Sequence, residues 1–182
     1  MKKYKIALLS GDGIGPEISA VSIKVLNKVS KKYNFDIEIN EQLFGGIAYE
    51  KYGSPAPVET LDKCKKSDAV LLACVGDMKY DSLARELRPE SGLLKLRSDL
   101  NLFANIRPVK IRKSLIDSST LKREIVENVD LVVVRELISG IYFGKPRGYI
   151  NNIEVPKAFN TMVYDYTEIK RITEIAIKIA NQ

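Results

Sequence analysis

The chain has 182 residues, of which 45% are hydrophobic and 29% charged, and its formal net charge is +6. This length suits one ordinary domain or two small ones, and the composition excludes a disordered or collagen-like chain. The sequence contains no histidine. A Ser-His-Asp triad, a histidine general base and a histidine-ligated zinc are therefore excluded, and proton transfer must fall to Tyr, Lys, Asp or Glu.

The charge distribution predicts the kind of partner, and the cysteine content predicts the cellular compartment. Most lysines occupy solvated helix positions without the interleaved aromatics of a nucleic-acid binder, so we expect small anionic substrates and no nucleic-acid partner. Cys64 and Cys74 are too few for a disulfide framework, which favours a cytoplasmic protein. The apolar run 6–9 is too short for a signal peptide, and no segment is long enough for a membrane span.

Strand-like and helix-like segments alternate along the chain. The predicted strands are 5–9, 35–41, 68–75, 101–109 and 130–137, the last read as buried, and the predicted helices are 16–32, 58–66, 91–100 and 121–128. This alternation predicts an α/β fold, with a mostly parallel sheet that carries helices on both faces.

The pattern changes after residue 139. Glycine, proline and asparagine punctuate two short alternating runs over 140–166, which predicts a projecting β arm. Isoleucines recur at helical spacing in 167–182, so we expect a terminal helix whose apolar stripe packs on another surface. Residues 1–139 then form the α/β domain, including the start of a second domain.

A glycine loop, SGDGIGPE, separates the first strand from the first helix. A dinucleotide-binding fingerprint would lie at this place, with Glu38 downstream. The spacing does not match, because a single residue separates Gly13 from Gly15 and Pro16 follows at once. The loop is either a tight turn that needs positive φ or a place where a ligand approaches the backbone closely.

Four motifs occur in order along the chain. They are GDGIGPE at 11–17, ESGLLKLR at 90–97, LFANIRP at 102–108 and VRELISGIYFG at 134–144. Together they resemble the isocitrate/isopropylmalate β-decarboxylating dehydrogenase family over nearly the whole chain. Members of that family are much longer, and this chain is similar to their N-terminal half.

The resemblance implies a reaction and its cofactors. NAD oxidises the 2-hydroxyl of (2R,3S)-3-isopropylmalate, and Mg²⁺ or Mn²⁺ assists loss of the 3-carboxylate to give 2-oxoisocaproate in leucine biosynthesis. The family's metal ligands and catalytic lysine lie in the other half, so no metal ligand is expected here and the isolated chain should not turn over. The alternatives are a family enzyme for isocitrate, homoisocitrate or tartrate, and a non-catalytic remnant that binds dicarboxylates or a partner. The family also implies a homodimer, with the β arm at its interface.

Three arginines match the family's substrate-binding arginines. A dicarboxylate requires fixed bidentate donors, which arginine supplies better than lysine. Arg97, Arg107 and Arg135 carry this assignment, although each could instead be a surface ion-pair partner. Arg135 interrupts the apolar run 131–134, where a charge must be paired or functional.

Further site residues follow from the same resemblance. Tyr142 matches a tyrosine that protonates the enol after decarboxylation, and would otherwise be a packing residue. Leu93 and Leu94 suit an apolar pocket for the isopropyl group, beside Glu90, or else belong to the helix core. The cofactor-binding residues implied by the family are Ile14, Gly76, Asp77, Met78, Lys79, Tyr80 and Glu90. The family usually has glycine and proline where Asp77 and Met78 stand, and an acidic side chain there would repel a phosphate or carboxylate.

Overall fold

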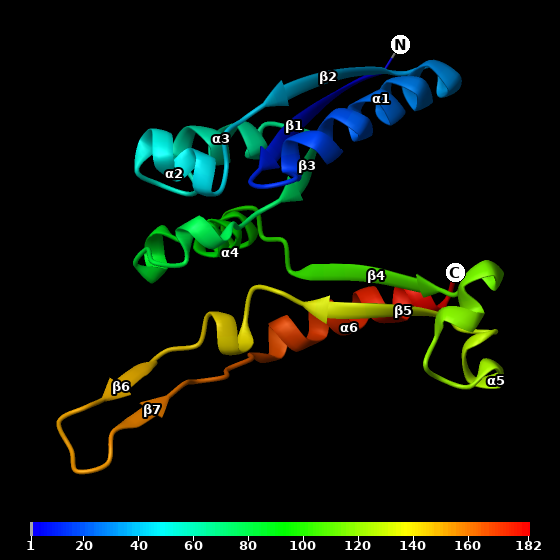
Figure 1. Ribbon diagram of the computed structural model, residues 1–182. Helices are drawn as coiled ribbons and strands as arrows, with labels where there is room; N and C mark the ends of the chain where they lie inside the picture. Colours follow the sequence, from blue (N-terminus) through cyan, green and yellow to red (C-terminus); the bar gives the residue numbers. More distant parts are fainter. Residues whose placement is uncertain (1) are drawn as a thin grey trace. The chain divides into compact units, whose positions relative to one another are not determined.

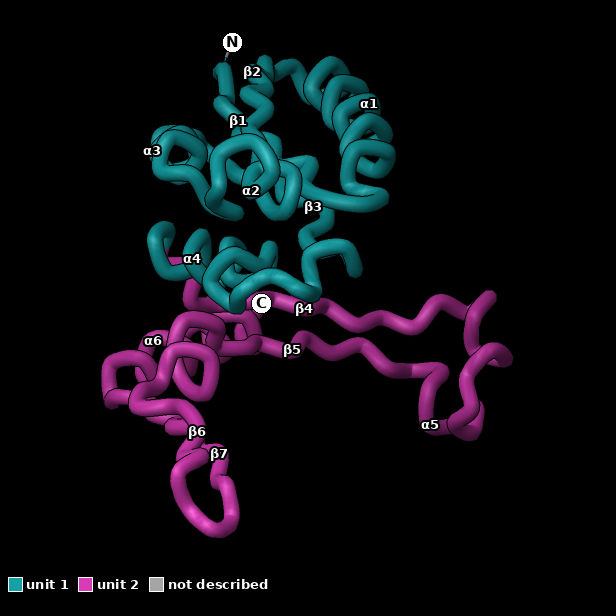
Figure 2. Tube along the Cα trace, turned by 60° about the vertical axis from the view of Figure 1, so that its left-hand side comes forward, with its two compact units in different colours: residues 1–100 teal, residues 101–182 magenta. Residues whose placement is uncertain are grey.

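The computed structural model describes residues 2–182 (Figure 1). The chain divides into two compact units, the first ending at Leu100 and the second beginning at Asn101 (Figure 2). Within residues 2–182, no helix combines the length and apolar composition that crossing a bilayer requires.

The first unit contains a parallel sheet of three strands in the order β2-β1-β3. Its strands are β1 (Lys3–Gly11), β2 (Asp36–Glu41) and β3 (Ala69–Cys74). The central strand pairs Ile6 with Ile39 on one side and Leu8 with Leu71 on the other. The α/β class and the parallel sheet predicted from the sequence are thus confirmed.

Helices cover both faces of this sheet. They are α1 (Gly15–Tyr33), α2 (Gly46–Tyr52), α3 (Val58–Lys65) and α4 (Pro89–Asp99), with 3₁₀ turns η1 (Met78–Tyr80) and η2 (Arg85–Leu87). The connections β1 to β2 and β2 to β3 run in opposite directions across the sheet, and right-handed crossovers then place their helices on opposite faces. Figure 2 shows α1 and α3 on opposite sides of the strands. The core beneath them joins Leu9, Phe44, Leu61 and Leu96.

The second unit is built on an antiparallel pair, β4 (Ala104–Lys110) and β5 (Asp130–Glu136). The mostly parallel sheet expected from the sequence therefore stays within the first unit. The predicted helix 121–128 is only the four-residue α5 (Arg123–Val126), preceded by the 3₁₀ turn η3 (Lys113–Ser118). These short turns reverse the chain, so β5 returns alongside β4, whereas a parallel return needs a longer crossover.

A long helix and a small arm complete this unit. They comprise η4 (Gly140–Tyr142), β6 (Gly148–Ile150), β7 (Lys157–Phe159) and α6 (Tyr166–Ala180). β6 and β7 pair antiparallel, and α6 lies along β5 (Figure 1). The N-terminus of α6 is closed by a capping box between Asp165 and Glu168.

The apolar residues of β5 and α6 are less covered than their composition predicts. Leu131, Val132 and Val133 are all exposed, so the expectation of a buried strand at 130–137 is wrong. No residue of α6 is fully buried, and Ile169 and Ile177 are more than half exposed. The helix α6 packs against β5 of this two-stranded ladder, and apolar side chains such as Ile106 and Val133 stay exposed.

Candidate active site

The glycine loop turns the chain from the end of β1 into α1. Gly11 has φ +69 and Gly13 has φ +53, so the tight turn requires glycine at both positions. Ile14 precedes the first helical residue, and its side chain is 58% exposed. The loop therefore exposes the apolar side chain of Ile14 beside glycine residues, whose backbone no side chain covers.

Asp12 connects this loop to two other segments. Its buried carboxylate accepts hydrogen bonds from the backbone N–H groups of Gly46, Ile47 and Gly76, each at 2.9 Å. Sequence reasoning did not single out this residue. The available signal was an acidic residue within a glycine turn at the end of an apolar strand.

The predicted cofactor residues around Gly76 gather at the same edge of the sheet. β1 and β3 end side by side, with Gly11 paired to Cys74, and ligands of open parallel sheets bind outside such carboxyl ends. A Cβ on Gly76 would lie 2.8 Å from a carboxylate oxygen of Glu90, so these two residues are neighbours. The Asp77 side chain is turned back to accept a hydrogen bond from the backbone of Lys79, at 3.1 Å.

This edge fits one end of a dinucleotide better than the other. Ile14 and Met78 expose apolar side chains beside glycine backbone, which suits a flat ring such as nicotinamide. Asp77 and Glu90 add negative charge, which disfavours a phosphate. The residues present thus fit the nicotinamide end of NAD. Within residues 2–182, no group of three His, Cys, Asp or Glu side chains is placed to hold a metal ion.

Lys79 and Tyr80 are engaged with α2. The Tyr80 hydroxyl donates to Glu50 at 3.0 Å, and the Lys79 ammonium lies 2.9 Å from the same oxygen. The Tyr80 ring is buried where a Cβ on Gly46 would lie only 1.8 Å from it. Both side chains hold the segment after β3 against α2, and their role toward the cofactor stays a prediction.

The environment of Glu50, Lys79 and Tyr80 shifts the pKa values of all three side chains. The hydrogen bond from Lys79, and then that from Tyr80, lowers the pKa of Glu50. The same contact with Glu50 raises the pKa of Lys79, and burial raises the pKa of Tyr80.

Glu50→Gln is expected to make the melting temperature fall less steeply as the pH is lowered. Because the folded-state pKa of Glu50 is lowered, its ionised form stabilises the fold above the ordinary glutamate pKa of about 4.3, and this contribution disappears as the pH falls through the folded value. At neutral pH the melting temperature of wild type should be higher than that of Glu50→Gln, and the two values should converge as the pH is lowered. Curves that stay parallel down to about pH 3 would show that Glu50 is uncoupled from folding.

The predicted substrate residues of the first unit share one face of α4. Glu90, Leu93, Leu94 and Arg97 follow the i, i+3, i+4, i+7 spacing of a single helical face. Leu96 belongs to the buried core, whereas Leu93 and Leu94 are only half-buried. The two leucines are therefore not core residues, and they lie on the face that carries Arg97.

In the second unit the structure brings two predicted arginines together. Arg135 on β5 pairs with Asn105 on β4, and Arg107 pairs with Val133. Directly paired residues project from the same face, so Arg107 and Arg135 are diagonal neighbours with Cβ atoms roughly 7–8 Å apart. Both arginines are exposed, and the Arg107 Nε donates to the side chain of Asn105. The expectation of a charge within a buried run is wrong for Arg135, because the run itself is open.

Tyr142 lies against Arg135, one member of this arginine pair. Arg135 Nη2 donates to the Tyr142 hydroxyl at 3.2 Å, and its guanidinium carbon lies 5.7 Å from the centre of the ring. Arg147, which the sequence analysis did not select, donates to the backbone oxygens of Tyr142 and Gly144 at 2.6 and 2.9 Å. The turn that carries the phenol is thus fixed from both sides.

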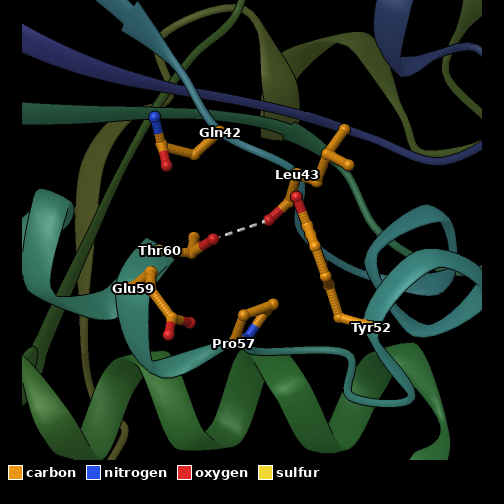
Figure 3. A pocket seen from close by; sticks show the side chains of 6 residues that line it. All are labelled: Gln42, Leu43, Tyr52, Pro57, Glu59 and Thr60. Carbon is orange, nitrogen blue, oxygen red and sulfur yellow. Dashed lines mark hydrogen bonds between the residues drawn. The ribbon is translucent and has the colours of Figure 1, made fainter.

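A pocket elsewhere in the first unit is separate from these residues. It has a volume of about 210 Å³, and Thr60 at its wall donates to the backbone oxygen of Leu43 at 3.0 Å (Figure 3). Its lining comprises Gln42, Leu43, Tyr52, Pro57, Glu59 and Thr60. None of the predicted site residues lines it.

The fold and the two residue groups define an α/β protein of the kind that binds ligands at the carboxyl ends of parallel strands. The isocitrate/isopropylmalate dehydrogenase family model matches residues 5–182, and the chain belongs to this family. The family inferred from the four sequence motifs is confirmed.

Several relatives are close in sequence. The 3-isopropylmalate dehydrogenase of Prochlorococcus marinus strain MIT 9312 is 82% identical over 182 residues, covering 100% of this chain and 51% of the relative. That of Wolinella succinogenes is 53% identical over 180 residues, covering 99% and 49%. The solved structure of isocitrate dehydrogenase from Methylococcus capsulatus matches with a TM-score of 0.76 at 28% identity, over 98% of this chain and 48% of that one. The chain spans about half the length of the curated relatives it matches.

Proposed function

We propose that the protein to which this chain contributes is an NAD-dependent 3-isopropylmalate dehydrogenase of leucine biosynthesis. It oxidises the 2-hydroxyl of (2R,3S)-3-isopropylmalate and releases the 3-carboxylate as CO₂, leaving 2-oxoisocaproate. The observation that carries this proposal is the juxtaposition of Arg107, Arg135 and Tyr142 on one face of the second unit. The relatives named above support the substrate class.

The chain's own residues account for binding and for one proton transfer. Arg107 and Arg135, diagonal neighbours on the second unit's strand pair, hold carboxylate oxygens of the substrate by charge-assisted hydrogen bonds. Arg97 on α4 stays a predicted carboxylate ligand of the first unit. NAD, with its nicotinamide held at the edge formed by Ile14 and Gly76, would supply the hydride acceptor for C2, and a divalent metal held by the family's ligands in the other half would supply a Lewis acid. As the bond from C3 to the carboxylate breaks and CO₂ leaves, its electrons pass to C3 and the adjacent carbonyl as an enolate. The Tyr142 hydroxyl, held beside Arg135, then delivers the proton to C3.

The α4 face supports the choice of substrate within the family. Leu93 and Leu94 lie beside Arg97, where they favour an isopropyl group over the third carboxylate of isocitrate. Apolar contacts of this kind discriminate by only about 1–3 kcal/mol. Charge repulsion between Glu90 and that third carboxylate adds to the preference.

We also propose a cytoplasmic homodimer. Both cysteines are free, which suits a reducing compartment. The arm within 140–166 leaves Tyr149 and Val155 largely exposed, as expected for a surface that packs against a second subunit.

Turnover tests the proposed function. We define the completed enzyme as this chain joined to the remaining half of the 82% identical Prochlorococcus marinus relative. It should form NADH with 3-isopropylmalate, NAD and Mg²⁺, and much less with isocitrate, whereas the isolated chain should form none. Steady turnover by the isolated chain would contradict the assignment of metal and lysine to the other half. An inactive completed enzyme that still binds isopropylmalate in calorimetry would favour a non-catalytic remnant instead.

A further inference from the structure

The Asp12 carboxylate joins three segments that are distant in sequence. Its donors lie 34, 35 and 64 residues away, in the first turn of α2 and just after β3. Asp12 is only 5% exposed. A buried carboxylate requires such donors, and it offers about four acceptor positions, of which three are used here.

The main chain of Asp12 reinforces the same junction. Its N–H donates to the backbone oxygen of Cys74 at 2.9 Å, and its own oxygen accepts from Gly15 at 2.8 Å. Asp12 therefore touches the last residue of β3, the first residue of α1 and the Gly76 turn. These are the segments that carry Ile14 and Asp77, the two sides of the proposed nicotinamide edge.

The surroundings fit an aspartate closely. A Cβ on Gly45, whose φ is +82, would lie 2.4 Å from the Asp12 carboxylate. There is thus no room for a longer side chain on that side. Asparagine has nearly the same shape, but its NH₂ would face one or more N–H donors and could not accept from them.

We propose that Asp12 is the positioning residue of the nicotinamide edge, because its carboxylate sets the separation between the Ile14 loop and the Gly76 turn. This inference rests on the proposed function for the identity of the ligand. Asp12 does not itself touch the reacting atoms. Its loss should therefore affect the dinucleotide more than the dicarboxylate, because its carboxylate holds Gly76 and its main chain holds the start of α1, the two segments of the proposed nicotinamide edge.

The test compares Asp12→Asn with Asp68→Asn. Asp68 is a matched control, because its carboxylate accepts a backbone N–H from Lys5 at 2.7 Å but lies at the opposite end of β3. In the completed enzyme, Asp12→Asn should raise the KM for NAD by about tenfold, with the KM for isopropylmalate nearly unchanged. Asp68→Asn should change neither constant. Equal KM values for NAD in Asp12→Asn and wild type, or equal increases for both substrates, would overturn the proposal.

Amide exchange and NADH titration separate this inference from the proposed function. In the 182-residue chain, the amides of Gly46, Ile47 and Gly76 should be protected together, and Asp12→Asn should speed their exchange by about tenfold. If Asp12→Asn does not fold, wild-type exchange decides, because a rapidly exchanging Gly76 amide contradicts the junction. If isopropylmalate is not oxidised, the proposed function fails. The role of Asp12 is still upheld in that case if Asp12→Asn binds NADH more weakly than wild type does. No NADH binding by wild type would overturn both.

Discussion

Arg135→Ala is expected to weaken the binding of 3-isopropylmalate by the completed enzyme about ten- to a hundredfold. Arg135 contributes a guanidinium to the proposed carboxylate site, and it also donates to the Tyr142 hydroxyl at 3.2 Å. A charge-assisted contact of this type is worth about 1.5–3 kcal/mol, which corresponds to that loss. Calorimetry gives the dissociation constant, and NADH formation gives the accompanying fall in kcat.

Two further variants make the result specific. Arg135→Lys keeps the charge but loses the bidentate fork, so it should fall between alanine and wild type. Arg112→Ala removes an exposed arginine just beyond the other end of the same ladder, and binding should be unchanged. If Arg135→Ala binds as well as Arg112→Ala, the carboxylate site lies elsewhere.

Gly11→Ala is expected to destabilise the first unit by about 2–4 kcal/mol. The new Cβ would lie 1.8 Å from the backbone oxygen of Cys74, and the residue has φ +69. Relief requires the ends of β1 and β3 to separate, because backbone atoms cannot rotate away as side chains do. Urea denaturation of the 182-residue chain measures the change in the free energy of unfolding.

Gly53→Ala isolates the backbone part of that effect. Gly53 has φ +70, but a Cβ there would meet nothing within 4 Å. This variant should lose only about 1 kcal/mol, the cost of a left-handed conformation for alanine. Equal losses at Gly11 and Gly53 would show that the close approach to Cys74 contributes nothing to stability.

Local patterns were sufficient for much of the first unit. Apolar runs and helical spacing predicted β1, β3 and α4, because these residues sit in the core that their patterns imply. Within α4, helical geometry puts Arg97 on the face that carries Leu93 and Leu94. Of the two interpretations of the glycine loop, the tight turn that needs positive φ agrees with the backbone of Gly11 and Gly13.

Features set by distant partners were not predictable in this way. Asp12 acquires its role from Gly46 and Gly76, far along the chain, and no local signal identifies those donors. The apolar residues of β5 predicted a buried strand, but burial also requires other elements to cover the strand. That depends on tertiary packing, which the local sequence does not show. The antiparallel return of β5 follows from a connection whose predicted helix is only one turn long.

Arg107 and Arg135 are proposed to hold carboxylate groups of one substrate molecule, beside the Tyr142 hydroxyl. A crystal structure of the completed enzyme with 3-isopropylmalate bound tests it most directly. We predict that nitrogens of both guanidinium groups lie within about 3.2 Å of substrate carboxylate oxygens, with the Tyr142 hydroxyl near C3. A substrate whose carboxylates are held by other side chains, with these arginines turned to solvent, would contradict the assignment of the arginines as substrate ligands.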